Sequence, residues 1–386
     1  MNKLKARFEN FDPQLKIASP GRINLIGEHT DYNQGFVFPA AIDKQIIYSI
    51  KENGSENECV VYSSDFDKIL QVDLNDVKPS DQEWENYILG VIYEIQKKNI
   101  KLRGFDCIIE SDLPIGAGVS SSAAMECGLA FALNRLFDLE LTKLDIVLLS
   151  QQAEHNFVGT KCGIMDQYAS VMSMEGHAIL LDCKNISHEY IPIELDPYTL
   201  LLLNTNVSHN LATGEYNTRR AECFEGVALL QKAGLEIDSL RDLNEETLVE
   251  NKSLLPEQVY RRCHYVVKEN ERVLKASHAL RNNNLQEFGS LLYQSHDGLQ
   301  NEYEVSCDEL DFLVEFSKNK PYVLGSRMMG GGFGGCTLNL VHKDQIDRYI
   351  DEVKAAYQKK FGIETDPIPV SPTRGTHLIQ YKKMES

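Results

Sequence analysis

The sequence has no apolar run that approaches the ~20 residues of a membrane-spanning helix. Its opening residues, MNKLKARFENFDPQLK, are charged throughout and lack the apolar core of a signal peptide. Hydrophobic residues make up 42% of the chain and charged residues 25%, as in soluble globular proteins. We therefore expect a cytoplasmic protein that does not associate with membranes.

The nine cysteines include no Cys-x-x-Cys pair. An odd number of scattered cysteines, several of them inside apolar segments, fits neither a disulfide framework nor a zinc site. We expect buried thiols in a reducing compartment.

Positive charge is also scarce, because 39 Lys and Arg face 57 Asp and Glu, for a formal net charge of −18. This balance argues against a nucleic-acid partner, whose phosphate backbone dominates binding. It does not exclude a nucleotide, since local N–H groups, a few cations and a bridging metal can hold a polyphosphate. No obligate protein partner is implied.

Two common phosphate-binding fingerprints are missing. In LPIGAGVSSSAA (residues 113–124, hereafter the glycine-serine loop), Ser121 replaces the third glycine of G-x-G-x-x-G, and no Walker A Gly-Lys-Ser/Thr follows. Gly116 and Gly118 still permit positive φ, and a small-residue helix is expected over 123–132. The loop is either an anion cradle or a plain turn before a helix.

The chain has no internal repeat or low-complexity segment and is too long for one ordinary core, which suggests at least two domains. The first half is rich in predicted strands, with Asn53-Gly54 as a hairpin turn between strands over 44–50 and 59–63. The second half is more helical, and its clearest helix covers 344–361. These patterns predict an α+β protein with two lobes and a change of domain near residue 180.

Charged residues gather in GRINLIGEHTDYN (residues 21–33, hereafter the signature segment). Arg22, Glu28, His29 and Asp31 stand among apolar residues, where charges are normally paired or solvated. They form either a loop of mutual salt bridges or a pocket for a polyhydroxy ligand. Arg22 is suited to neutralising a transferring phosphoryl group.

Two further carboxylates flank a break in the helical pattern. Glu154 precedes the break, and Asp166 follows it in the apolar sequence CGIMDQY. Each could simply cap or solvate a helix end. Phosphoryl transfer, however, needs a metal ligand and a carboxylate that orients the acceptor. Glu154 and Ser122 suit the first role, and Asp166 suits the second.

Two more segments stand out. GEYNTRR at 214–220 is either a simple helix start or part of a site, and the glycines at 330–335 precede a predicted strand over 336–341. Five glycines in six positions indicate tight backbone packing against a ligand or the other lobe.

In this order, the segments resemble the GHMP small-molecule kinase superfamily and, within it, the galactokinase family. The signature segment carries the most specific resemblance, the glycine-serine loop resembles the superfamily's phosphate loop, and GGGFGGC at 330–336 resembles its third motif. The resemblance implies a two-lobed fold, with a GHMP N-terminal domain over 1–180 and a C-terminal domain over 181–386. It places the active site in the cleft between the lobes.

The resemblance also implies ATP, Mg²⁺ and the transfer of a phosphoryl group to the anomeric hydroxyl of α-D-galactose, the first committed step of galactose catabolism (the Leloir pathway). Asp166 would be the catalytic carboxylate and Arg22 its stabiliser. The implied sugar-binding residues are Glu28, His29, Thr30, Asp31, Gly163, Asp166 and Tyr216. The implied ATP-binding residues are Ser63, Gly116, Ala117, Gly118, Val119, Ser120, Ser121 and Ser122. Ser122 and Glu154 would hold Mg²⁺.

Two alternatives stay open. One is a kinase for a related sugar such as N-acetylgalactosamine or L-arabinose, because specificity depends on the shape of the pocket. The other is a sugar- and ATP-sensing regulator that has lost the chemistry. Such regulators are damaged in the serine-alanine part of the loop, whereas Ser120 to Ala124 are intact here.

Overall fold

A mixed six-stranded sheet organises the first half of the chain in a computed structural model that describes residues 4–114, 116–208 and 212–382. The strand order is β13-β1-β3-β6-β4-β5. The strands are β13 (His377–Tyr381), β1 (Leu15–Asn24), β3 (Pro39–Glu52), β6 (Phe105–Ser111), β4 (Glu58–Ser63) and β5 (Lys68–Asp73). Since β13 pairs antiparallel with β1, the end of the chain returns to its first sheet.

The predicted hairpin at Asn53-Gly54 is wrong. Strand β6 lies between β3 and β4, pairing antiparallel with β3 and parallel with β4. The backbone N–H of Asn53 donates to Gly104 O (3.2 Å), and the Asn53 side chain accepts from the N–H of Ser55 (2.9 Å). The turn residues therefore connect two strands that are separated by a third.

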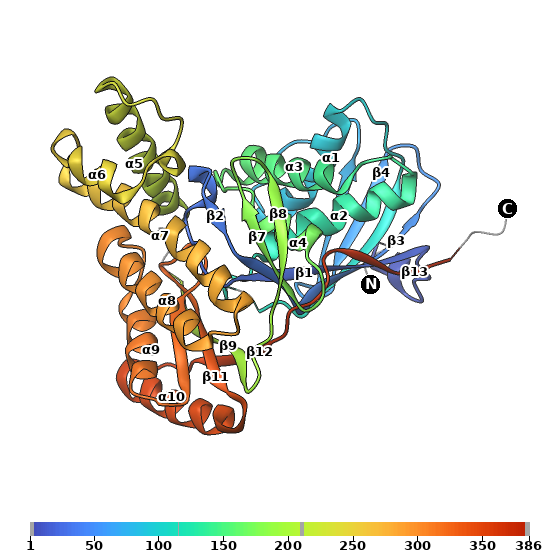
Figure 1. Ribbon diagram of the computed structural model, residues 1–386. Helices are drawn as coiled ribbons and strands as arrows, with labels where there is room; N and C mark the ends of the chain where they lie inside the picture. The colour runs from blue at the N-terminus through green and yellow to red at the C-terminus, as the bar shows by residue number, and fades with distance from the viewer. Residues whose placement is uncertain (1–3, 115, 209–211, 383–386) are drawn as a thin grey trace.

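Four helices cover one face of this sheet: α1 (Glu83–Lys97), α2 (Ser121–Phe137), α3 (Lys143–Ala153) and α4 (Met165–Met172) (Figure 1). Helix α1 buries Ile88, Val91, Ile92 and Ile95, whose spacing is that of one helix face. Thr142, with Asp145 three residues later, has the spacing of a helix cap, and the two residues form a reciprocal capping box at the start of α3. A small sheet of β2 (Phe36–Val37), β7 (His177–Asp182) and β8 (Ser187–Pro192) lies beside these helices.

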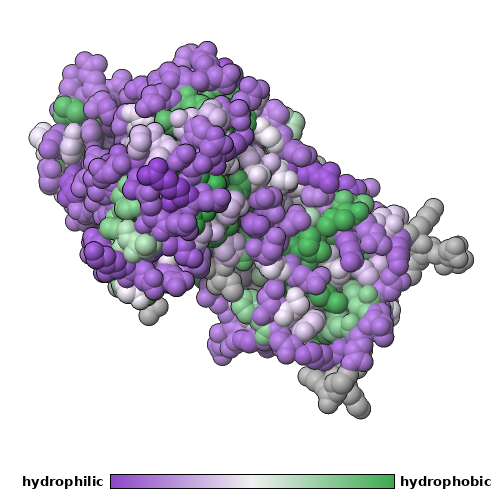
Figure 2. All heavy atoms as spheres, turned by 90° about the horizontal axis from the view of Figure 1, so that it is seen from below, coloured by the Kyte–Doolittle hydropathy of each residue, from purple (hydrophilic) through white to green (hydrophobic). Residues whose placement is uncertain are grey.

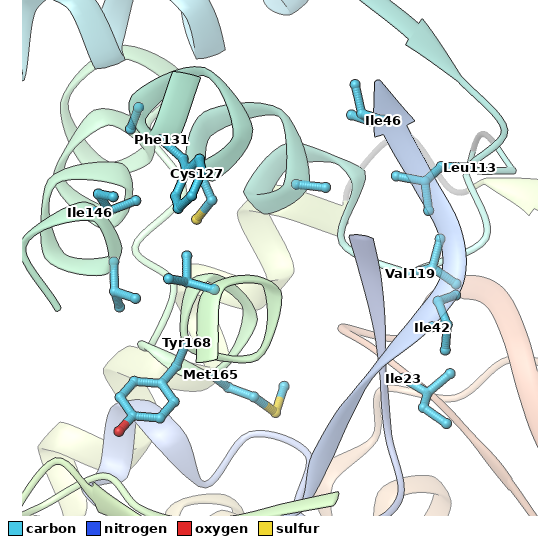
Figure 3. Packing of buried hydrophobic residues seen from close by; sticks show 14 of the residues in the cluster. Ile23, Ile42, Ile46, Leu113, Val119, Cys127, Phe131, Ile146, Met165 and Tyr168 are labelled. Atoms are coloured by element: carbon cyan, nitrogen blue, oxygen red, sulfur yellow. The ribbon is translucent and has the colours of Figure 1, made fainter. Parts of the chain in front are cut away.

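The apolar core continues up to the glycine-serine loop. Leu113, the first residue of the loop, and Val119, near its middle, lie on the side of Ile42 and Ile23 from β3 and β1, as Figure 3 shows. On the other side, Cys127 and Phe131 of α2 face Ile146 and Tyr168 of α3 and α4. The loop is therefore packed against the apolar core.

The second half combines a four-stranded antiparallel sheet with most of the longer helices. The sheet contains β10 (Val323–Met328), β11 (Gly334–His342), β9 (Tyr198–Ser208) and β12 (Asp366–Val370) in that order. The helices are α5 (Ala212–Lys232), α6 (Glu245–Glu250), α7 (Glu257–Arg281), α8 (Leu285–Gly298), α9 (Asp308–Lys318) and α10 (Ile346–Phe361). Helix α10 ends at Gly362, whose φ is 74°. A division at residues 180/181 stays a prediction.

The face drawn in Figure 2 is mostly hydrophilic, with hydrophobic patches that include some on the half that carries the six-stranded sheet. Across the described ranges, no helix is both long and apolar enough to span a membrane. The nine cysteines are unpaired, and six of them are buried, as the sequence predicts.

Candidate functional site

A polar pocket lies where the two halves of the chain meet. The signature segment supplies Arg22, Glu28, His29 and Asp31 to its walls. The other lining residues are Cys162, Met165, Asp166, Tyr216, Gly330 and Gly331. Most of the sugar-binding residues expected from the sequence are thus brought together.

Arg22 and Asp166 meet in this pocket. Arg22, on β1, is 4% exposed, and its Nε and Nη2 donate to Oδ1 (2.8 Å) and Oδ2 (2.9 Å) of Asp166, at the start of α4. Burial opposes the charge on Arg22, but Asp166, Glu28 and Asp31 together raise its pKa above the usual value. This bidentate ion pair fixes the direction in which the Asp166 carboxylate points.

The glycine-serine loop closes over the same ion pair. Nη1 of Arg22 donates to Gly118 O (2.6 Å), and the Ser120 hydroxyl donates to Oδ2 of Asp166 (2.5 Å). Gly116, Gly118 and Ser120 all have positive φ, of 72°, 69° and 59°. Ile115 lies outside the described residues. The family resemblance implies that Ser120 binds the phosphates of ATP, and that role stays a prediction.

The predicted tight packing of the glycines at 330–335 is confirmed. A β-carbon on Gly330 would lie 3.3 Å from the carbonyl oxygen of Gly118, and one on Gly118 would lie 3.4 Å from that of Met329. Backbone from the second half therefore packs directly on the glycine-serine loop.

The Asp31 carboxyl lies in the pocket beside Gly163. Burial, and then the charge of Asp166, raise the pKa of Asp31 from 3.8 to about 7, although backbone N–H groups of Tyr32 and Met165 act in the opposite direction. Near neutral pH this group can both donate and accept hydrogen bonds, which suits a sugar hydroxyl.

His29 is a buried, neutral imidazole. Its Nδ1 lies 2.8 Å from the Tyr32 hydroxyl, which is 2.7 Å from that of Tyr303. Burial lowers the pKa of His29 to about 3, so the ring is uncharged at neutral pH. Its buried Nε2 makes no well-formed hydrogen bond to the described residues, although the backbone of Gly331 interacts with the ring and opposes the shift. The Tyr216 ring from α5 packs on His29, with centroids 5.3 Å apart.

Glu28 and Thr30 point in different directions. Glu28 is 2% exposed, and its Oε1 accepts from the backbone N–H of Gly330 (2.9 Å) at the pocket wall. The Thr30 hydroxyl is fully buried, within hydrogen-bond distance of the carbonyl oxygens of Gly27 (2.9 Å) and Phe36 (2.6 Å). In this structure Thr30 supports the loop, and a sugar contact from it stays a prediction.

Glu154 stands at the start of a π-helical turn, Glu154–Val158, that continues α3. Such turns often occur at functional sites. Burial, and then Asp166, raise the pKa of Glu154 to about 7, while hydrogen bonds from Cys162, Ser122 and Gln167 oppose the shift. Oε2 of Glu154 accepts from the Gln167 side chain (3.0 Å). Ser122 and Glu154 therefore lie close together, and their role as Mg²⁺ ligands stays a prediction.

A second, more apolar pocket adjoins the other side of the glycine-serine loop. Ser63, which the sequence assigns to the nucleotide, lines it together with Ser121 and Ser122. Its other walls are Ile46, Asp65, Phe66, Trp84, Tyr87, Ile109, Ser111, Leu113 and Met125. The rings of Phe66 and Trp84 lie 6.3 Å apart. Sequence reasoning missed these two aromatic residues, and the only signal was that Trp84 is the single tryptophan.

Three family descriptions match the chain. A galactokinase galactose-binding signature matches residues 2–52, the GHMP kinases N terminal domain matches 86–174, and the GHMP kinases C terminal domain matches 276–359. The first includes the signature segment, and the second includes both the glycine-serine loop and Asp166.

Relatives match along nearly the whole chain. A galactokinase of Thermosipho africanus is 42% identical, and the match covers 95% of this chain and 100% of the relative. A galactokinase of Chloroflexus aggregans is 39% identical, and the match covers 100% of this chain and 99% of the relative.

Solved structures show the same fold. Lactococcus lactis galactokinase complexed with galactose is 35% identical, with a TM-score of 0.93 over 97% of this chain and 98% of that one. Mevalonate kinase of Methanococcus jannaschii shares the fold, with a TM-score of 0.66 over 94% of this chain and 99% of that one. The two chains are 20% identical. The matched signature and the full-length similarity in sequence and fold show that the chain belongs to the galactokinase family of the GHMP kinases.

Proposed function

We propose that this protein transfers the γ-phosphoryl group of ATP to the anomeric hydroxyl of α-D-galactose. The observation that carries the proposal is the Arg22–Asp166 ion pair, which lies between the sugar-type pocket and the glycine-serine loop. A carboxylate and a cation at that junction are the groups that phosphoryl transfer to an alcohol requires. The relative whose structure contains galactose supports the choice of sugar.

The sugar is bound by groups of complementary hydrogen-bonding character. Glu28 accepts, Asp31 both accepts and donates near neutral pH, and Nε2 of His29 meets a further hydroxyl. Tyr216 closes the pocket from α5. A hydroxylated ring satisfies this set, whereas an apolar ligand would leave buried polar groups unpaired.

ATP occupies the second pocket and the glycine-serine loop. The base lies among Ser63, Phe66 and Trp84, and the phosphates lie against the N–H groups of residues 116–122 at the start of α2. Helix N-termini and glycine-rich turns favour such anions.

Asp166 orients the sugar in the reaction. Its carboxylate accepts a hydrogen bond from the anomeric hydroxyl and takes the proton as the anomeric oxygen bonds to the γ-phosphorus and the bond from that phosphorus to the ADP oxygen breaks. Arg22 holds Asp166 in line and offsets the negative charge around it. Because the transition state is loose, most of the rate comes from positioning.

Ser122 and Glu154 would hold Mg²⁺ together with the nucleotide's phosphates. A hydroxyl and a carboxylate are hard oxygen ligands, and Mg²⁺ usually takes only one or two protein carboxylates. The interaction of Ser122 with Glu154, which opposes the rise in the pKa of Glu154, supports this pairing. The ion would neutralise charge on the phosphates.

Release of ADP measured separately with galactose, N-acetylgalactosamine and L-arabinose tests the proposal. Galactose should give the highest kcat/KM, and ADP release without sugar should be negligible. Preference for another of these sugars would favour the related-sugar alternative, and no sugar-dependent release would favour the regulator. A cytoplasmic location and the lack of an obligate protein partner stay predictions.

A further inference from the structure

Arg327, at the end of β10, is a fully buried arginine whose donors all point toward the signature segment or its own strand. Its side chain is 0% exposed. Nε donates to Leu25 O (2.9 Å), Nη2 to Asn24 O (2.8 Å), and Nη1 to Met328 O (2.7 Å). The second half of the chain is thereby joined to the strand end that leads into the sugar pocket.

The same guanidinium makes an ion pair with Glu28. Nη2 of Arg327 lies 2.6 Å from Oε1 of Glu28, which also accepts from the N–H of Gly330. In the part of the chain that the structure describes, both hydrogen bonds to this carboxylate end on Oε1. The other oxygen, Oε2, is therefore left for a ligand in the pocket that Glu28 lines.

Charge explains why a second arginine is needed here. The pocket walls contain three carboxyl groups: the buried Glu28 and the partly buried Asp31 and Asp166. Arg22 is committed to Asp166, so Arg327 is the cation that pairs with Glu28. A buried carboxylate that loses its cation becomes costly and tends to turn away or take up a proton.

We propose that Arg327 is a positioning residue that sets the affinity for the sugar by holding Glu28 in place. It touches neither the reacting atoms nor the nucleotide pocket, so it acts on sugar binding and not on phosphoryl transfer. The inference rests on the proposed function, because it takes Glu28 as a sugar ligand.

A purely structural role predicts different behaviour. Arg327 also holds two backbone carbonyls of the strand end, so its loss should lower stability in either case. Arg262 on α7 is a matched control, because it is 1% exposed and ion-paired to Glu222 (3.0 Å) and Glu304 (2.5 Å), without contact to Glu28. Its replacement removes a comparable buried cation elsewhere.

The test uses the full chain with Arg327→Met, Arg327→Lys, Glu28→Gln, the Arg327→Met/Glu28→Gln double variant and Arg262→Met. Dissociation constants for galactose and for a non-hydrolysable ATP analogue are measured by calorimetry, and kcat by ADP release. We expect Arg327→Met to weaken galactose binding about 30-fold or more. Binding of the analogue should change by less than about threefold.

The other variants decide whether Arg327 acts through Glu28. The double variant should bind galactose no more weakly than Glu28→Gln alone, because coupled residues are not additive. Arg327→Lys should recover part of the affinity, and Arg262→Met should leave it within about threefold. Unchanged galactose binding in Arg327→Met, multiplied losses in the double variant, or equal losses for galactose and the analogue would overturn the proposal.

Two further outcomes are distinguished: a folding defect in Arg327→Met, and failure of the proposed function itself. If Arg327→Met does not fold, Arg327→Lys decides alone: weaker galactose binding with unchanged analogue binding supports the proposal, and unchanged galactose binding overturns it. Failure of the proposed function would appear instead in the unmodified protein, as absent galactose binding and absent galactose-dependent ADP release.

Discussion

Asp31 and Gly163 are in such close contact that a β-carbon on Gly163 would lie 2.0 Å from Oδ2 of Asp31. Only glycine leaves room for the carboxyl group in its present position. The contact joins the signature segment to the chain just before Asp166, and therefore fixes one wall of the polar pocket relative to the Asp166 carboxylate.

Gly163→Ala should therefore raise the KM for galactose while leaving the KM for ATP nearly unchanged. The added methyl group displaces Asp31, and we expect a loss of about 10-fold or more, since misplacing a binding group by an ångström is costly. Gly214→Ala is the matched control, because a β-carbon there would meet nothing within 4 Å. Equal KM values for galactose in the two variants would contradict the placement of Asp31 in the pocket.

Asp166→Asn should lower kcat by about 10²–10⁴-fold, the range for loss of a positioned general base. The amide keeps the size of the carboxyl group but cannot accept the hydroxyl proton. Galactose binding, measured by calorimetry, should persist because Glu28, His29 and Asp31 are unaltered. A variant with near-normal turnover would remove Asp166 from the catalytic role.

Glu154→Gln should increase the Mg²⁺ concentration needed for half-maximal rate. Replacing even an indirect partner of a metal ligand commonly changes metal affinity by about 10–100-fold, so loss of a direct ligand should cost at least as much. The measurement is a Mg²⁺ titration of ADP release at saturating galactose. An unchanged Mg²⁺ dependence would exclude Glu154 from the metal site.

Asp31 should make stability depend on pH. Its pKa is about 7 when folded and 3.8 in the reference state, so between these values the folded protein binds more protons than the unfolded chain. The stability that Asp31 contributes is complete below about pH 4 and is lost as the pH rises toward 7. His29, whose pKa is lowered to about 3, acts in the opposite direction between about pH 3 and its ordinary value of 6.5.

Comparison with Asp31→Asn isolates this effect, because His29 titrates in both proteins. Between about pH 5 and pH 8, the unmodified protein should lose on the order of 2 kcal/mol of unfolding free energy relative to the variant, a figure reduced for the opening of the pocket to water. Denaturant unfolding without ligands provides the measurement. Parallel pH profiles would show that the carboxyl group is not perturbed.

Much of the site could be predicted because its residues occur in short, chemically distinctive segments. Arg22 to Asp31 are close in sequence, and burying so many charged groups in one apolar stretch requires either mutual pairing or a ligand. The structure shows both: Arg22 is paired, while the Nε2 of His29 lacks a well-formed partner in the described part of the chain. Local spacing also predicts the capping box at Thr142 and the end of α10 at Gly362.

What the sequence did not predict depends on contacts between distant segments. Turn chemistry at Asn53-Gly54 cannot reveal that β6, some fifty residues later, inserts between β3 and β4. Phe66 and Trp84 become a wall of the second, more apolar pocket only when a loop and a helix start come together. Arg327 looks like an ordinary strand residue until its partner Glu28, 299 positions away, is placed beside it.

In the proposed reaction, Asp166 directs the anomeric oxygen of galactose to the γ-phosphorus of ATP. The most direct measurement is the NMR spectrum of the sugar product formed by the full chain with ATP, Mg²⁺ and galactose. We predict a phosphorus resonance coupled to the anomeric proton, as in α-D-galactose 1-phosphate, and its loss in Asp166→Asn. Coupling to the C6 protons, or ADP formation without a phosphorylated sugar, would contradict phosphoryl transfer to the anomeric oxygen.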